Sequence, residues 1–316
     1  MSAYKRNHYV PEFLLKKLCG DTNSVNVYTY NAKENKLEMN IVDPSKDKCF
    51  RNFAVSKNIY NASFNISFEE KNVNIFENKL YKQILSASQV LLEQYDFLLN
   101  NDMYLTDLAG FILHIFVRNI NFLIWLKDYL DQIPETQMYK KKGDIFGLGF
   151  QATFMTKLPD GTTILDVMYN FLKKASCNVR YIKDNKCFIH SNIILNLDKD
   201  FFLKPISKDF INEIDNLDLA SPQEFLSKKL MLVVPLSNSL YLEFYLEDKR
   251  NINLICSDIE NNLWFERYIL ACLNIPCSFI IYDSKLNLNN FYWIGEETAK
   301  KGIFYMLKRT HDFKNK

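Results

Sequence analysis

The chain carries almost no excess charge and lacks the uninterrupted apolar run of a membrane span. Its 316 residues include 39 basic and 37 acidic side chains, a formal net charge of +2. No strong global field therefore draws it to nucleic acid or to an anionic membrane, although a local basic groove stays open. The most apolar stretch, residues 108–126, contains Arg118, Asn119 and Asn121 near its centre, where a span of about 20 residues has few such groups. We expect a buried helix there and no membrane partner.

Familiar catalytic and metal-binding motifs are also missing. The sequence has no phosphate-binding loop, no Gly-x-Ser-x-Gly nucleophile elbow and no His-Glu-x-x-His zinc motif. Its seven cysteines stand at irregular spacings with no Cys-x-x-Cys pair, and no secretory signal opens the chain. This usage is typical of reduced thiols, so we expect a cytoplasmic protein. The balance of 48% apolar and 24% charged residues indicates a folded chain.

The hydrophobic pattern predicts an α+β fold with a central antiparallel helix pair packed against β-hairpins from the N- and C-terminal segments. Apolar residues recur at spacings of three and four over residues 69–132, and the polar residues 100–102 divide this stretch. Polar turns between alternating segments predict hairpins, and capping and periodicity predict further helices. The hairpins are expected at 25–41, 179–197 and 230–246, and the helices at 164–174, capped by Thr162 or Thr163, at 257–273 and at 296–309.

We expect one intimate unit over residues 1–316. A subdivision places the N-terminal hairpin and the helix pair in residues 1–134, a mobile loop in residues 135–162 and a β-rich part in residues 163–316. The loop is predicted because residues 135–162 are poorly patterned and contain three of the chain's eight glycines before Pro159.

A narrow polar stripe runs along the predicted helix at 103–132. Asp107, His114, Arg118 and Asn121 fall on one side of an otherwise apolar helical wheel. One interpretation places Arg118 and Asn121 in an anion-binding cleft, with His114 one turn away as an acid or base. The other makes the stripe a solvent edge, or pairs Arg118 with a carboxylate for structural reasons. Both interpretations stay open.

The N-terminal element resembles an uncharacterised bacterial family. His8 and Tyr9 precede Val10 and Pro11, and a Phe-Leu-Leu run follows. This arrangement resembles domain-of-unknown-function family four-two-three-eight, whose members open with His-Tyr-x-Pro-x-x-x-Leu. Its later Phe-x-x-Ser-Asp-x-Pro and Pro-Leu-Ser elements resemble residues 188–194 and 234–237, although Asn192 stands in place of the family's Asp. The resemblance implies a fold and no activity. His8 itself either anchors the chain or delivers an imidazole into a cleft.

Two weaker patterns bear on metals and phosphates. Asp198 ends a predicted strand, and Glu247 follows another in a Glu-x-Lys arrangement. Together they are weak candidates to bind a divalent metal as a cofactor. The interpretation that competes with a metal site is a solvated turn. Basic runs at 140–142 and on the last helix, Lys300–Lys301 and Lys308–Arg309, are either phosphate contacts or solvated surface.

The leading functional hypothesis is a phosphate-directed enzyme, a hydrolase or nuclease in a phage-defence or mobile-element context. His8 and His114 would be catalytic, Arg118 and Asn121 would bind the anion, and nucleic acid or a nucleotide would be the ligand. The alternative is a non-catalytic sensor or regulatory binding protein that acts through a protein partner.

Overall fold

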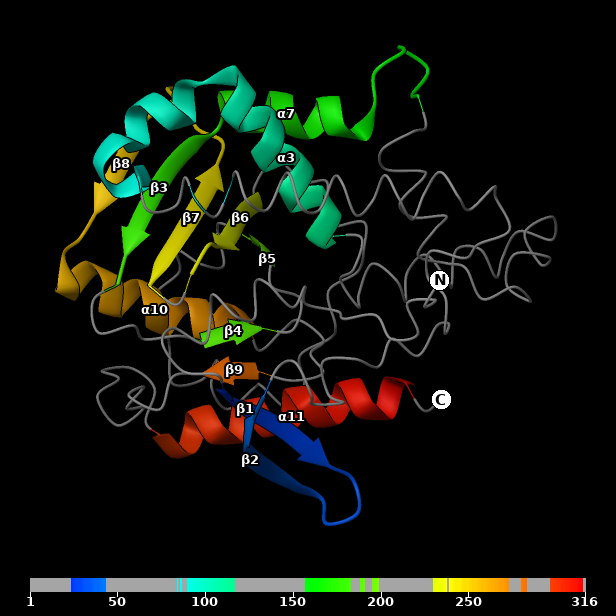
Figure 1. Cartoon of the computed structure of the whole chain (residues 1–316). Coiled ribbons are helices and arrows are strands. Elements are labelled where there is room, and N and C mark those ends of the chain that lie inside the picture. The colour runs from blue at the N-terminus through cyan, green and yellow to red at the C-terminus, as the bar shows by residue number, and fades with distance from the viewer. Residues whose placement is uncertain are drawn as a thin grey trace.

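The computed structural model describes residues 24–43, 84, 86, 90–116, 157–182, 188–190, 195–198, 230–237, 239–272, 280–282 and 296–314. These residues form helices packed against two β-sheets, which confirms the predicted α+β class (Figure 1). The N-terminal element with His8, and the part of the predicted helix pair that carries Arg118 and Asn121, lie outside the described residues.

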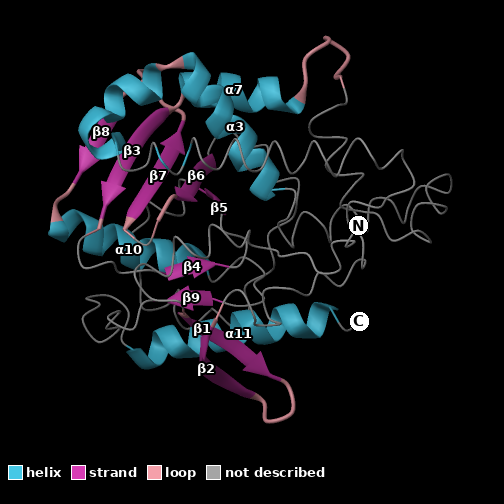
Figure 2. Cartoon of the chain, viewed as in Figure 1, coloured by secondary structure: helices cyan, strands magenta, loops and turns pink. Residues whose placement is uncertain are grey.

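A five-stranded sheet lies at the top of the view in Figure 2, with the strand order β5-β6-β7-β3-β8. Its neighbouring strands are antiparallel except for β3 and β8, which run parallel. The central strands β3 and β7 are buried at every residue but their last, as strands covered on both faces must be. The strands are β3 (Ser176–Tyr181), β5 (Leu195–Asp198), β6 (Leu230–Pro235), β7 (Leu240–Tyr245) and β8 (Ile252–Ile255).

A second sheet of four antiparallel strands has the order β2-β1-β9-β4 and joins segments from both ends of the chain. The C-terminal helix α11 (Glu296–Lys314) packs against β1 and β2 at the bottom of Figure 1. The strands of this sheet are β1 (Val25–Asn31), β2 (Lys36–Val42), β4 (Phe188–His190) and β9 (Ile280–Tyr282).

Helices cover both faces of the five-stranded sheet because successive residues of its strands point to opposite sides. Helices α3 (Asp102–Phe116) and α7 (Ile164–Lys174) pack together on one face, and Leu242 of β7 is buried in the same cluster as Phe111 of α3. Tyr241 points the other way and meets Trp264 of α10 (Asp258–Cys272), with ring centroids 5.5 Å apart. None of the helices within the described residues is both long and apolar enough to cross a membrane.

Side-chain caps fix where the helices begin. The predicted break falls at Asn101, whose Oδ1 accepts a hydrogen bond from the backbone three residues later at the start of α3. Thr163 and Asp166 form a reciprocal capping box on α7, which identifies Thr163 as the predicted cap. Ser257 Oγ accepts from the backbone N–H of Glu260 at 3.4 Å and starts α10 as predicted.

Arg250 joins the ends of two helical segments at one point in the upper layer. Its Nε donates to the carbonyl of Ala175, which caps the end of α7, at 3.1 Å. Its Nη2 donates to the carbonyl of Leu99 at 2.7 Å, and its Nη1 donates to Asn100 Oδ1. A single guanidinium thus bonds the ends of α7 and of the helical residues 90–100, where carbonyl groups have no helical partner and attract a cation.

The hairpins predicted at 25–41 and 230–246 are confirmed, but the one predicted at 179–197 is wrong. Strand β3 pairs with β7 and β8, so both of its edges are occupied and β4 cannot join it. Strand β4 instead pairs with β9 in the second sheet, and β5 pairs with β6. The polar turn predicted at 184–186 correctly indicated that a strand ends before it. It wrongly indicated that the strands on its two sides pair with each other. Helix α11 begins where predicted and continues to Lys314.

Candidate functional site

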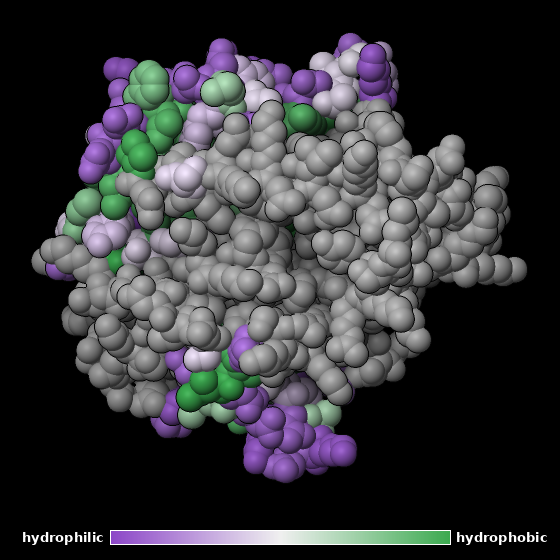
Figure 3. Space-filling view, viewed as in Figure 1, coloured by the Kyte–Doolittle hydropathy of each residue, from purple (hydrophilic) through white to green (hydrophobic). Residues whose placement is uncertain are grey.

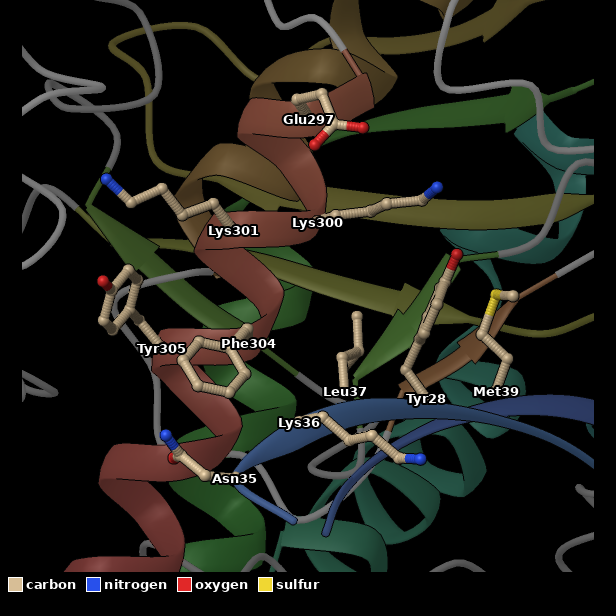
Figure 4. A pocket seen from close by; sticks show the side chains of 10 residues that line it. All are labelled: Tyr28, Asn35, Lys36, Leu37, Met39, Glu297, Lys300, Lys301, Phe304 and Tyr305. Carbon is tan, nitrogen blue, oxygen red and sulfur yellow. The ribbon is translucent and has the colours of Figure 1, made fainter.

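A groove of about 660 Å³ lies between the β1–β2 hairpin and α11 (Figure 4). This volume falls within the range of roughly 300–1,000 Å³ that is typical of small-ligand sites. Tyr28, Leu37 and Met39 rise from the hairpin on the side toward which Lys300 extends from α11. Both sides of the groove therefore carry aromatic and basic side chains, and the hairpin adds the apolar Leu37 and Met39.

The tip of the hairpin is held in place by its own side chains. Asn31 Oδ1 accepts from the backbone N–H groups of Lys33 at 2.9 Å and of Glu34 at 3.2 Å. Asn35 takes a positive φ of 47°, which asparagine tolerates well, and its Oδ1 accepts from the Tyr30 hydroxyl at 2.9 Å. The hydrophilic tip projects at the bottom of Figure 3, and this fixed geometry places Lys36 at the groove.

Helix α11 presents one face to the protein and an aromatic edge to the groove. Phe304 and Tyr305 are half-buried and line the groove, with their ring centroids 5.3 Å apart. Phe304 also meets Tyr30 of β1 edge to face, at 5.8 Å, so the helix and hairpin contact each other through aromatic rings. The residues of α11 buried beneath this edge are Ile303, Met306 and Leu307.

Lysine side chains lie beside these rings. Lys301 Nζ is 5.6 Å from the centroid of the Tyr305 ring, and Lys308 Nζ is 5.8 Å from that of Phe304. Both distances are within the range of a cation–π contact, which holds an ammonium over an aromatic face. Positive charge and flat apolar surface thus occur together along one edge of α11.

Acidic groups offset part of this charge. Lys36 pairs with Glu34, and this hydrogen bond, with the charge of Glu34, raises the pKa of Lys36 above its ordinary value. Glu297 lines the groove one helical turn before Lys300 and Lys301. The groove consequently has a modest positive charge, so it suits contact with a few anionic groups of a ligand and with an apolar part.

The structure separates the predicted site residue His114 from this groove. His114 is 0% exposed and belongs to a run of buried α3 residues, whereas Asp107 of the same stripe is half-exposed. Helix α3 lies in the upper layer and α11 in the lower one (Figure 1). The other predicted residues of that site, His8, Arg118 and Asn121, lie outside the described residues.

The weak metal candidates lie at the end of one strand and shortly after the end of another strand of the same sheet. Asp198 is the last residue of β5 and pairs with Leu230, the first residue of β6. Glu247 is exposed and follows β7, so β6 stands between the two acids. Strands two apart lie about 10 Å from each other. Within the part of the chain that the structure describes, no three metal-ligating side chains gather, and Cys177 and Cys256 are free thiols.

A buried ion pair that the sequence analysis did not identify lies on the α10 face of the five-stranded sheet. Arg180 of β3 donates from Nε to Glu243 of β7 at 2.5 Å, and their side chains are 10% and 7% exposed. The Arg180 guanidinium also lies 5.0 Å from the ring centroid of Trp264. The signal in the sequence was one basic residue and one acidic residue, each inside a predicted strand. The two opposite charges meet each other inside the sheet, which offsets the cost of burying them.

No protein-family model, curated protein or solved structure matches the chain. The resemblance to domain-of-unknown-function family four-two-three-eight therefore stays a prediction. The fold and the groove define an α+β protein with a basic, aromatic groove between an N-terminal hairpin and a C-terminal helix.

Proposed function

We propose that the protein binds a phosphate-bearing ligand in the groove between the β1–β2 hairpin and α11. The observation that carries the proposal is that Lys36, Lys300 and Lys301 all line one groove of ligand size, in which Lys300 extends toward the side of Tyr28 and Met39 (Figure 4). Lysine is a compact cation with three donors, and it contacts phosphate oxygens as a point charge. The aromatic rings beside the lysines favour a ligand that also has a flat apolar part, as a nucleotide does.

Calorimetric titration with ATP and with inorganic triphosphate, at low salt, tests the proposal. The double variant Lys300→Gln/Lys301→Gln should bind both ligands at least about tenfold more weakly, a loss of about 1.4 kcal/mol. Lys174→Gln/Lys249→Gln is the matched control, because it removes the same charge from exposed positions in the upper layer. Equal affinity in the two double variants would contradict the proposal.

We also propose hydrolase or nuclease activity, in phage defence or on a mobile element. This second part of the proposal is supported by the sequence alone. It depends on His8 and Arg118, together with His114, whose burial does not favour contact with a ligand. Incubation of the same protein with nucleotides and nucleic acids, with Mg²⁺ or Mn²⁺ and with EDTA, tests it. Turnover lost in Arg118→Ala would support an enzyme, whereas binding without turnover would support a sensor or regulatory binding protein.

A further inference from the structure

We infer that the ligand of the groove is single-stranded nucleic acid, with an unpaired base against the aromatic and apolar wall and phosphates beside the lysines. This inference rests on the phosphate binding proposed above and names the class of ligand. Three features of the groove lead to it: the aromatic edge of α11, the apolar side chains along β2, and the small number of cations.

The aromatic edge of α11 suits a stacked base. Phe304 and Tyr305 are half-buried, so part of each ring is accessible, and a lysine lies over each ring. Stacking on an aromatic ring beside a basic group is the common way in which proteins bind single strands, because every base has a flat face. In a duplex both faces of each base are covered by its neighbours, and these rings would have no base to contact.

Exposed apolar side chains extend this wall along β2. Met39 is 62% exposed and Ile41 is 78% exposed, and both alternate in register with Leu37 on the face that pairs with Tyr28 and Tyr30. Such a row at the mouth of a basic groove is typical of a binding surface. Its apolar atoms can contact an unstacked base or its sugar, but they cannot contact the phosphates that line the outside of a duplex.

The number of cations is too small for a duplex to be the preferred ligand. Proteins that bind duplex DNA without base contacts depend on many lysines and arginines. Each of these residues neutralises a phosphate and so releases a counterion from the DNA. Here Lys36, Lys300 and Lys301 line the groove, Glu34 pairs with Lys36, and Glu297 opposes the other two. About three phosphate contacts to a single strand predict a slope of about −2 when the logarithm of the binding constant is plotted against the logarithm of salt concentration.

Fluorescence anisotropy with labelled oligonucleotides tests the inference. Single strands of DNA and of RNA, about 12 nucleotides long, are compared with a duplex of the same length, and inorganic triphosphate is used as a competitor. We expect the single strand to bind at least tenfold more tightly than the duplex, with the shallow salt slope given above (about −2). Tighter binding of the duplex, or a slope several times steeper, would overturn the inference and leave the phosphate proposal intact.

Substitutions separate stacking from charge. Phe304→Leu keeps an apolar side chain and removes the aromatic face, so it should weaken single-strand binding about tenfold and leave triphosphate binding unchanged. Met39→Ser, at an exposed position, removes part of the apolar wall and should also weaken single-strand binding without changing triphosphate binding. Unchanged single-strand affinity in the folded variants would refute the inference. If the wild-type protein binds neither triphosphate nor oligonucleotides, the proposed phosphate-binding function itself is refuted.

Discussion

Arg180 and Glu243 are a cation and an anion that neutralise each other inside the five-stranded sheet. Glu243→Gln keeps the shape of the side chain and leaves the buried Arg180 without a counter-charge. Removing one partner of a buried pair costs about 3–5 kcal/mol, so we expect the free energy of unfolding to fall by about 3 kcal/mol. Urea unfolding followed by circular dichroism measures this change.

An exposed ion pair provides the control for this prediction. Asp102 of α3 accepts from Lys173 of α7 at 3.0 Å, and their side chains are 65% and 52% exposed. Because solvent screens such a pair, Asp102→Asn should lower the free energy of unfolding much less than Glu243→Gln does. The apolar double variant Arg180→Met/Glu243→Leu should cost less than Glu243→Gln alone, since it leaves no buried charge. A mild effect of Glu243→Gln, equal to that of Asp102→Asn, would show that the buried pair is solvated.

At the scale of the elements, the loss of Arg250 should destabilise two helical segments at once. Arg250→Ala removes the donor from the carbonyls of Leu99 and Ala175 at the ends of two helical segments. A hydrogen bond to a charged group contributes about 1.5–3 kcal/mol, so we expect a loss of about 2–4 kcal/mol for this half-buried residue. Hydrogen exchange should show faster opening of α7 and of residues 90–100.

Two substitutions test whether the fork geometry of Arg250 matters. Arg250→Lys keeps the charge but cannot donate to three separated acceptors, so it should recover part of the lost stability and no more. Lys249→Ala changes the exposed neighbour and should stay within about 0.5 kcal/mol of the wild-type protein. Full recovery by lysine would mean that charge alone, and not the fork, joins these elements.

The elements predicted correctly from the sequence are those that local chemistry specifies. The hairpin around Ser237 and the caps at Thr163 and Ser257 depend on residues a few positions apart, and turn and capping patterns predict them. Strand β3 pairs with β7, which is many residues away, and the turn that follows β3 does not indicate this pairing. Strand pairing between distant segments was therefore the part of the fold that local patterns predicted wrongly.

The candidate site was predictable only in part for the same reason. Lys300 and Lys301 were identified as residues that can contact phosphate, but Phe304 and Tyr305 fall at core spacings and gave no signal of a site. The groove exists because α11 packs on a hairpin from the opposite end of the chain. Side chains that meet across such a distance cannot be joined into one site by spacing in the sequence.

At the scale of the whole molecule, acid should weaken the upper layer through a small set of carboxylates. Asp102, Asp160 and Asp166 lie at or before the starts of α3 and α7. Hydrogen bonds lower the pKa of each: the main donor is Lys173 for Asp102, and neighbouring threonines donate to the other two. Because these pKa values are lower in the folded than in the unfolded chain, the charged forms stabilise the fold.

The direction of the pH effect follows from this difference. The stabilisation is complete above the ordinary value of 3.8 for an aspartate and is lost as the pH falls through 3.8 to the lower folded values. Acid also charges the molecule as a whole, since 37 acidic groups are neutralised while 39 basic ones remain. That repulsion acts on every variant alike, so only a comparison between variants isolates the aspartates.

Asp160→Asn/Asp166→Asn supplies that comparison. At neutral pH the variant should be less stable than the wild-type protein, because an amide accepts the threonine hydrogen bonds less strongly than a carboxylate. Well below pH 3.8 the wild-type aspartates are themselves neutral, so the difference in the free energy of unfolding should shrink toward zero. Urea unfolding at several pH values measures it. A difference that stays constant down to the acid limit would mean that these carboxylates act by shape and not by charge.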